Sequence, residues 1–157
     1  MPDQKLYIAY GSNLNVRQMR WRCPDAMPVG VGILDGWQLL FKGSKTGSYL
    51  TVDRSQGSCV PVAVWAVSAE DERRLDRYEG YPDFYYKKVI TLPVEDLLTG
   101  KVRKKKAFIY IMHEERAFGI PSMDYVQTCL EGYRNFGFKT APLVRAYRIS
   151  EEVCNGK

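Results

Sequence analysis

Acid–base chemistry in this chain has few candidate groups, because the sequence contains a single histidine. That residue, His113, follows a Tyr-Ile-Met stretch typical of the end of a strand, and alone it cannot form a two-histidine metal site. The four cysteines lie far apart, and no pair has the spacing of a zinc ribbon or a thioredoxin-type motif. They are Cys23, Cys59, Cys129 and Cys154. We therefore predict no metal site and expect proton transfer to use a carboxylate, a lysine or a tyrosine.

One carboxylate, Glu79, is notable for its position on a predicted helix. Leu75, Tyr78 and Glu79 occur at i, i+3 and i+4, so they share a face, and Leu75 and Tyr78 should mark its inward side. Glu79 also lies in the last turn, where the helix dipole disfavours negative charge. Partial burial and the dipole would both raise the pKa of this carboxyl, as suits a proton shuttle. The alternative is a capping glutamate or one paired with Arg77 or Lys87.

A second segment that could form a binding site spans residues 7–14 and reads Tyr-Ile-Ala-Tyr-Gly-Ser-Asn-Leu. A strand ends here, the glycine permits a sharp turn, and a short helix is predicted to follow. Such a turn can aim successive backbone N–H groups at one point and bind a carboxylate or phosphate oxygen. An ordinary strand-to-helix turn capped by Asn13 or Asn15 fits these residues equally well.

A glycine-rich stretch at residues 30–36 resembles a dinucleotide-binding loop only superficially. Its third glycine comes one residue late, and a strand pattern follows where that motif requires a helix. These glycines are better explained by bulges or by close packing between strands. We therefore expect no cofactor.

The chain carries a net charge of +5, which permits an anionic partner without requiring one. Residues 101–106 include five basic residues in six. They form either a phosphate-contacting patch or an exposed hairpin arm whose charges discourage edge-to-edge pairing. No aromatic residue lies within the run, which disfavours binding by base stacking. We favour the exposed arm and expect no nucleic-acid partner.

The elements that must position these residues are mostly strands. Segments rich in β-branched and aromatic residues recur between glycine, proline or polar clusters and predict about seven strands. These lie at residues 5–10, 30–42 (one strand or two), 49–53, 60–67, 85–92, 107–112 and 143–149. Helices are predicted at residues 15–22, 69–79 and 123–136, the last two capped by Ser68 and Ser122. Because helices and strands do not alternate one for one, we predict an α+β fold, a mixed barrel or strongly curved sheet with helices outside.

Length and composition bound what remains. The chain has 157 residues, of which 45% are apolar and 26% charged, as expected for one domain spanning residues 1–157. No apolar run approaches the roughly 20 residues of a membrane span, and residues 1–5 lack the apolar stretch of a secretory signal. We expect a cytoplasmic protein without a membrane partner, and the sequence leaves open whether it is a monomer or a homodimer.

Two motifs together carry a resemblance to a known family. The first is Tyr-Gly-Ser-Asn-Leu at residues 10–14, and the second is Tyr-Glu-Gly-Tyr-Pro at residues 78–82, followed by Tyr-Tyr-Lys-Lys at residues 85–88. Their combination, order and spacing resemble the gamma-glutamylcyclotransferase-like family, and the similarity spans about residues 5–149. That family also includes gamma-glutamylamine cyclotransferases and a lyase of aminoglycoside biosynthesis. The resemblance implies a single-domain mixed β-barrel of the gamma-glutamylcyclotransferase type.

The resemblance also implies roles for individual residues. The family's loop lines the substrate pocket, and the matching substrate-binding residues are Tyr7, Ile8, Ala9, Tyr10, Gly11 and Ser12. The family's catalytic glutamate corresponds to Glu79. A tyrosine that begins the next strand corresponds to Tyr85 better than to Tyr86. A later tyrosine corresponds to Tyr125, through a looser match around residues 121–125.

The implied enzyme is a cofactor-independent gamma-glutamyl cyclotransferase that acts on a small γ-glutamyl amino acid or amine. The substrate's α-amine attacks its own γ-carbonyl, 5-oxoproline forms, and an amine or amino acid leaves. Glu79 takes a proton from the α-ammonium and returns it to the leaving nitrogen. Backbone N–H groups of the Gly11–Ser12 turn hold the α-carboxylate and orient the substrate.

Two other functions stay open on the residues alone. One is a non-catalytic module on the same fold that binds a small acidic ligand. The other is a nucleic-acid-binding module that uses the arm at residues 101–106, for which binding would fall steeply with salt. Loss of Glu79 should leave both of these functions intact, which separates them from the enzyme.

Overall fold

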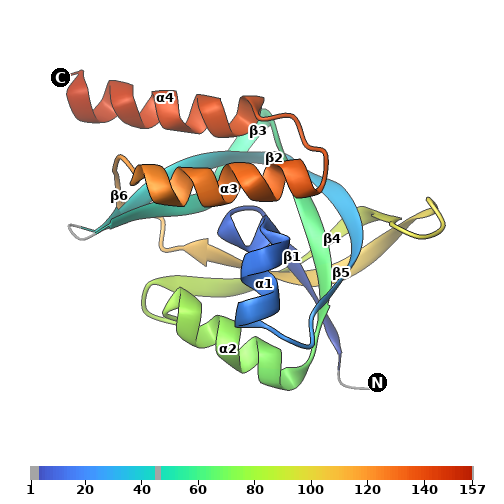
Figure 1. Cartoon of the computed structure of the whole chain (residues 1–157). Helices are drawn as coiled ribbons and strands as arrows, with labels where there is room; N and C mark the ends of the chain where they lie inside the picture. The colour runs from blue at the N-terminus through green and yellow to red at the C-terminus, as the bar shows by residue number, and fades with distance from the viewer. Residues whose placement is uncertain (1–3, 45–46, 157) are drawn as a thin grey trace.

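The computed structural model describes residues 4–44 and 47–156 (Figure 1). Five strands close into a barrel in the order β3-β1-β5-β4-β2, and β2 pairs again with β3. They are β1 (Lys5–Ala9), β2 (Met27–Ser44), β3 (Gly47–Val67), β4 (Tyr85–Asp96) and β5 (Val102–Met112), with a short β6 (Ala117–Phe118) paired to β2 outside the barrel. β1 and β5 run parallel, whereas their other neighbours pair antiparallel. The predicted α+β mixed barrel is confirmed.

Helices cover the outside of this barrel. They are the 3₁₀ turn η1 (Ser12–Leu14) and the α-helices α1 (Val16–Arg22), α2 (Ala69–Glu79), α3 (Met123–Asn135) and α4 (Ala141–Asn155). α4 packs against β2 and α3 packs against η1, and in Figure 1 both lie above the barrel while α2 lies below it. Within the described residues, no helix combines the length and the apolar character that a membrane crossing requires.

Local sequence signals set the helix ends. Ser68 and Ser122 cap α2 and α3 as predicted, each accepting a backbone N–H three residues on. Asn15 caps α1 in the same way. Gly80 ends α2 in the left-handed region, with φ of 65°, where a glycine is favoured. This stop makes Glu79 the last residue of α2 and directs the chain back toward the barrel.

The predicted strands at residues 49–53 and 60–67 are two parts of one long strand, β3. Residues 54–59 between them are polar, which suggested a break, but β3 continues through them and pairs with β2 at both ends of this stretch, at Arg54 and Cys59. β2 shifts register opposite it, and Gly36 and Gly57 take positive φ angles of 85° and 87° there. The irregularity in pairing therefore falls at this polar stretch, and β3 resumes its pairing with β2 on both sides of it. The stretch at residues 30–42 likewise belongs to a single strand, β2.

The last predicted strand, residues 143–149, is wrong, because these residues belong to α4. Their β-branched and aromatic content favoured a strand. However, Leu143, Ala146 and Ser150 are the buried residues, and their i, i+3 and i+7 spacing is helical. Pro142 fits the first turn, where a backbone N–H has no partner within the helix. Packing on β2 therefore decides the structure of this segment.

The basic run at residues 101–106 lies in the hairpin that joins β4 to β5 and extends away from the barrel (Figure 1). All six of these residues are exposed. Its position agrees with the exposed arm predicted from the sequence, and none of its residues lines the cavity described next.

Candidate active site

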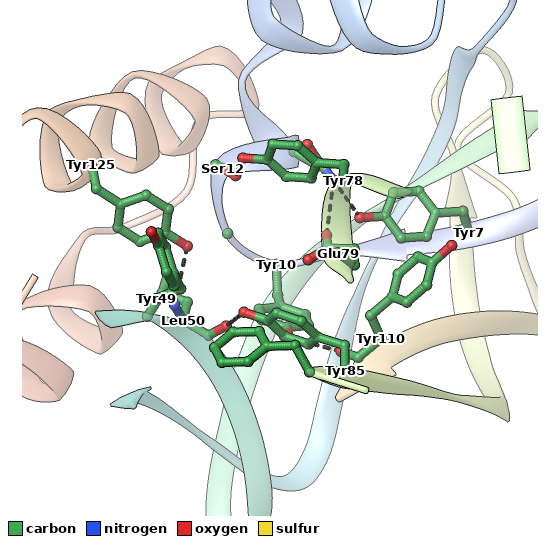
Figure 2. Close-up of a pocket in the computed structure, with 13 residues that line it drawn as sticks. Tyr7, Tyr10, Ser12, Tyr49, Leu50, Tyr78, Glu79, Tyr85, Tyr110 and Tyr125 are labelled. Atoms are coloured by element: carbon green, nitrogen blue, oxygen red, sulfur yellow. Dashed lines mark hydrogen bonds between the residues drawn. The ribbon is translucent and has the colours of Figure 1, made fainter. Parts of the chain in front are cut away.

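A cavity of about 310 Å³ lies where the barrel meets η1, α2 and α3. Residues far apart in the chain line it, as Figure 2 shows: Tyr7, Tyr10, Gly11, Ser12, Asn13, Tyr49, Leu50, Tyr78, Glu79, Phe84, Tyr85, Tyr110 and Tyr125. Seven of these are tyrosines, and Glu79 is the one carboxylate among the described residues of the lining. The cavity thus surrounds a single acid with aromatic walls and hydroxyl groups.

Most of the site residues predicted from the sequence meet at this cavity. They are Tyr7, Tyr10, Gly11, Ser12, Glu79, Tyr85 and Tyr125. Ile8 and Ala9 do not line it, because their side chains are buried in the core. Tyr86 also faces elsewhere and hydrogen-bonds the side chain of Glu114. The structure thus brings Tyr85, and not Tyr86, to the cavity.

Glu79 directs its carboxylate into this cavity from the end of α2 (Figure 2). Its Oε2 accepts a hydrogen bond from Nδ2 of Asn13 at 3.4 Å. Within residues 4–44 and 47–156 it forms no ion pair, and Lys87, one partner considered for it, pairs with Glu72. Burial raises the pKa of Glu79 to about 8, although the positive charge of Arg22 opposes the rise. Such a carboxyl can both accept and donate a proton near neutral pH.

Tyr78 lies differently from the prediction. Leu75 is fully buried as expected, but 46% of the Tyr78 surface is exposed. Its hydroxyl hydrogen-bonds Oγ of Ser12 at 3.2 Å, and the guanidinium of Arg22 stacks on its ring at 3.5 Å. Tyr78 therefore covers the cavity beside Glu79 instead of entering the core.

Three tyrosine hydroxyls around the cavity already donate hydrogen bonds within the protein. Tyr10 donates to the carbonyl of Tyr110 at 2.7 Å, and Tyr85 donates to the carbonyl of Leu50 at 2.7 Å. Tyr110 donates to Oδ1 of Asp76 at 2.6 Å. Each hydroxyl has one hydrogen, so in this arrangement these three can accept from a bound molecule but not donate to it.

Tyr7 and Tyr125 are hydrogen-bonded in the opposite sense. The hydroxyl of Tyr7 accepts from Nδ2 of Asn13 at 2.8 Å, and that of Tyr125 accepts from the backbone N–H of Leu50 at 3.0 Å. Burial raises the pKa of both tyrosines well above 10, so the hydroxyls stay protonated. These two tyrosines are therefore able to donate a hydrogen bond to a bound molecule.

The loop between β1 and η1 contributes two residues with free backbone donors, Gly11 and Ser12, to the lining of the same cavity. No described residue accepts a hydrogen bond from the backbone N–H of Gly11 or Ser12, and both residues line the cavity. The loop packs tightly, since a Cβ on Gly11 would lie 3.3 Å from Cδ1 of Leu50 and 3.4 Å from the Tyr125 hydroxyl. Adjacent free N–H groups suit a carboxylate oxygen.

Sequence reasoning missed several lining residues: Asn13, Tyr49, Leu50, Tyr78, Phe84 and Tyr110. Asn13 belongs to the Tyr-Gly-Ser-Asn motif, so its place there was an available signal. Tyr49 and Leu50 lie near the start of β3 and meet the cavity only through long-range pairing, which no local pattern indicates. Among residues 4–44 and 47–156, no group of three or more His, Cys, Asp or Glu side chains is arranged to hold a metal ion.

The family described as gamma-glutamyl cyclotransferase, AIG2-like, matches residues 7–127 of this chain. The matched segment extends from β1 into α3, so it contains all the residues that line the cavity. No curated protein matches the sequence.

Several solved structures share the fold of this chain. A structure named gamma-glutamyl cyclotransferase superposes with a TM-score of 0.72 and is 27% identical, covering 85% of this chain and 80% of that one. An uncharacterized protein from Homo sapiens superposes with a TM-score of 0.70 and is 28% identical, with the same coverage of both chains. A yeast gamma-glutamyl cyclotransferase specific to glutathione has a TM-score of 0.56 over 94% of this chain and 95% of that one, but at 12% identity it shows the shared fold alone.

Proposed function

This chain belongs to the gamma-glutamyl cyclotransferase, AIG2-like family, and we propose that it converts a γ-glutamyl amino acid or γ-glutamyl amine to 5-oxoproline. The substrate's α-nitrogen attacks its own γ-carbonyl carbon, which forms the new carbon–nitrogen bond of a five-membered lactam. The bond from that carbon to the leaving nitrogen then breaks. No water is consumed, because the nucleophile and the carbonyl belong to one molecule.

Glu79 moves the proton in this proposal. The α-ammonium must lose a proton before its nitrogen can attack, and the carboxylate of Glu79 accepts it. The same carboxyl then returns the proton to the leaving nitrogen as the carbon–nitrogen bond breaks. The ring nitrogen still carries two hydrogens at this point, and it loses one of them to the regenerated carboxylate or to the released amine, which gives the neutral lactam. A carboxyl with a pKa of about 8 accepts a proton from an ammonium group far more readily than one with the ordinary value of 4.5.

The remaining groups of the cavity hold the substrate in its reactive shape. The free N–H groups of Gly11 and Ser12 bind the α-carboxylate, and the hydroxyls of Tyr7 and Tyr125 donate to substrate oxygens. Orientation matters because ring closure requires the amine to meet the carbonyl carbon at short range, and fixing that geometry can remove several kcal/mol from the barrier, about 7–11 in the best cases.

The observation that supports the proposal most strongly is the pairing of one desolvated carboxylate with free backbone donors in one cavity. Glu79 supplies a base near neutral pH, and the Gly11–Ser12 turn supplies anion binding. A module that only held a small acid would gain nothing from a second, partly buried carboxylate beside its anion site, because the two charges repel.

Product formation tests the proposal directly. The purified protein is incubated with a panel of γ-glutamyl amino acids and γ-glutamyl amines, and 5-oxoproline is assayed by mass spectrometry beside Glu79→Gln. We expect release by the wild type from at least one class and its loss in the variant. Equal release by both proteins would remove Glu79 as the proton shuttle. No release from any member of either class would overturn the proposal in favour of a binding protein.

A further inference from the structure

Arg22, the last residue of α1, lies behind two residues of the cavity without lining the cavity itself. One guanidinium nitrogen, Nη1, donates to Oδ1 of Asn13, and the guanidinium plane stacks on the ring of Tyr78. Asn13 donates to the Glu79 carboxylate, and Tyr78, which precedes Glu79 in the chain, lines the same cavity. We propose that Arg22 is a positioning residue that fixes the environment of the Glu79 carboxylate through these two neighbours.

The first part of this role concerns the amide of Asn13. A guanidinium carries only donors, so it must face the oxygen of the amide, and the amide nitrogen must then face the other way. That nitrogen reaches two groups of the cavity, the hydroxyl of Tyr7 at 2.8 Å and Oε2 of Glu79 at 3.4 Å. Without Arg22 the amide is free to turn and present its oxygen to the carboxylate, which would repel it.

The second part concerns Tyr78. A guanidinium stacked on an aromatic ring is attracted to its face, and the contact here is close, at 3.5 Å from the ring centre. Nη2 of Arg22 also donates to Oε1 of Gln18 at 2.9 Å, which ties the guanidinium to its own helix. Tyr78 is in turn hydrogen-bonded to Ser12, so the cover beside Glu79 is held from both sides.

Charge is the third part. The groups that face Glu79 from the packed elements are tyrosine hydroxyls on β1, β4, β5 and α3 and in the loop after β1: Tyr7, Tyr85, Tyr110, Tyr125 and Tyr10. Burial raises the pKa of all five, so they stay neutral. Among the described residues, Arg22 is the one charged group that acts on Glu79 strongly enough to shift its pKa, which it lowers.

Arg20 provides a matched control. It lies two residues from Arg22 on the same helix, carries the same charge and is exposed, and its side chain makes no hydrogen bond or ion pair within residues 4–44 and 47–156. Replacing Arg20 by Met removes an equal charge from α1 without touching Asn13 or Tyr78. A general effect of net charge would therefore appear in both variants.

The test is a pH titration of the Glu79 side-chain carboxyl carbon by NMR in the substrate-free protein, assigned with Glu79→Gln. We expect a midpoint near pH 8 in the wild type and one about one pH unit higher in Arg22→Met, because the variant lacks the positive charge that lowers the pKa of Glu79. Arg20→Met should leave the midpoint unchanged. An unchanged midpoint in folded Arg22→Met, or equal changes in both variants, would overturn the role of Arg22.

A kinetic measurement tests whether Arg22 positions Asn13 and Tyr78 for catalysis, and this test rests on the proposed function. Arg22→Lys keeps the charge but loses the planar fork that serves Asn13 and Tyr78 together. We expect its pH profile to match the wild type while kcat falls about tenfold and KM changes little. If Arg22→Met does not fold, a wild-type kcat in Arg22→Lys would by itself overturn the proposal. The titration needs no substrate, so absence of any turnover would count against the cyclotransferase function alone.

Discussion

The two ends of α2 carry glutamates with opposite surroundings, although the residues are seven apart and so lie on the same side of the helix. At the first end, Glu72 pairs with Lys87 at 2.7 Å and with Lys5 at 3.0 Å. Burial disfavours its charged form, but the two lysines outweigh burial and lower its pKa. At the other end Glu79 has one amide donor, Asn13, among the described residues, and burial raises its pKa to about 8.

The difference shows that burial alone does not decide how a carboxyl titrates. Both glutamates lose hydration, and what separates them is whether cations lie within hydrogen-bonding distance. The pairing also anchors the helix, because Lys87 reaches Asp76, one turn further along α2, at 3.0 Å and Asp76 accepts the Tyr110 hydroxyl. Glu72 and Asp76 thus fix α2 on β4 and β5, whereas Glu79 at the end of the helix places an unpaired acid in the cavity.

Replacing each glutamate by glutamine should give the largest difference in activity between two variants. Glu79→Gln should lower kcat/KM for 5-oxoproline release at least about a hundredfold, because general acid–base catalysis contributes on that scale. Glu72→Gln should stay within about threefold of the wild type, since Glu72 does not line the cavity. Similar losses in the two variants would mean that both act through the position of α2 and not through proton transfer.

Glu79 and Glu72 should contribute to the free energy of unfolding with opposite dependences on pH. Folded Glu79 holds its proton up to about pH 8 and the unfolded chain only to about 4.5. Between these values the folded state binds more protons, so its stability falls as pH rises. Glu79→Gln removes this loss and should be more stable than the wild type at pH 8.5, by about 2–5 kcal/mol, but not at pH 4.5.

Glu72→Gln is the control for that comparison. Its carboxylate is stabilised by the two lysines, so its removal should cost about 1 kcal/mol at pH 7, a modest amount because Lys5 is largely exposed. Guanidinium unfolding of both variants at the two pH values measures the contrast. A Glu79→Gln variant that loses stability at pH 8.5 would contradict the raised pKa of Glu79.

Two tyrosines that line the cavity near Glu79 differ in whether their hydroxyl can donate a hydrogen bond to a substrate. Tyr7 accepts from the Asn13 amide and keeps its hydrogen, whereas Tyr10 already donates to the carbonyl of Tyr110. We expect Tyr7→Phe to lower kcat/KM about tenfold, the loss of one useful hydrogen bond, and Tyr10→Phe to lower it about threefold or less. Steady-state kinetics on one γ-glutamyl substrate compares the pair, and the reverse order would contradict the assignment of donors.

The smallest effect is expected from making Glu72 resemble Glu79. Lys87→Met removes one of the two cations at Glu72, so burial is less opposed and the pKa of Glu72 should rise. Lys88→Met is a matched control, because Lys88 is exposed and forms no ion pair in the described part of the chain. NMR titration of the Glu72 carboxyl carbon detects the change. Equal titration in both variants would show that Lys87 is not what separates the two glutamates.

The sequence predicted the fold where local signals and burial agree. The capped helices at Ser68 and Ser122 and the strand before Gly11 are examples, since caps and apolar runs are local features. It failed at residues 143–149, whose β-branched content favours a strand until packing on β2 is known. It also divided β3 at residues 54–59, because this polar stretch lacks an apolar pattern although pairing with β2 resumes on both sides of it.

For the candidate site, sequence reasoning identified the two segments that meet, around Gly11 and Glu79. It could not identify Tyr49 and Leu50 as lining residues, because their contact with the cavity depends on how β3 is placed in the closed barrel. Nor could it find Arg22, whose role depends on the orientation of a side chain across the α1–α2 contact. Long-range geometry therefore accounts for most of what was missed.

The most direct test of the central claim is the pH dependence of kcat/KM for 5-oxoproline release between pH 5 and 10, with Glu79→Gln measured in parallel. The unpaired, partly buried carboxyl predicts an ascending limb with its midpoint near pH 8, carried by Glu79 and absent from the residual activity of the variant. A limb centred near pH 4.5, or a variant with the rate and profile of the wild type, would contradict the claim that Glu79 is the proton shuttle.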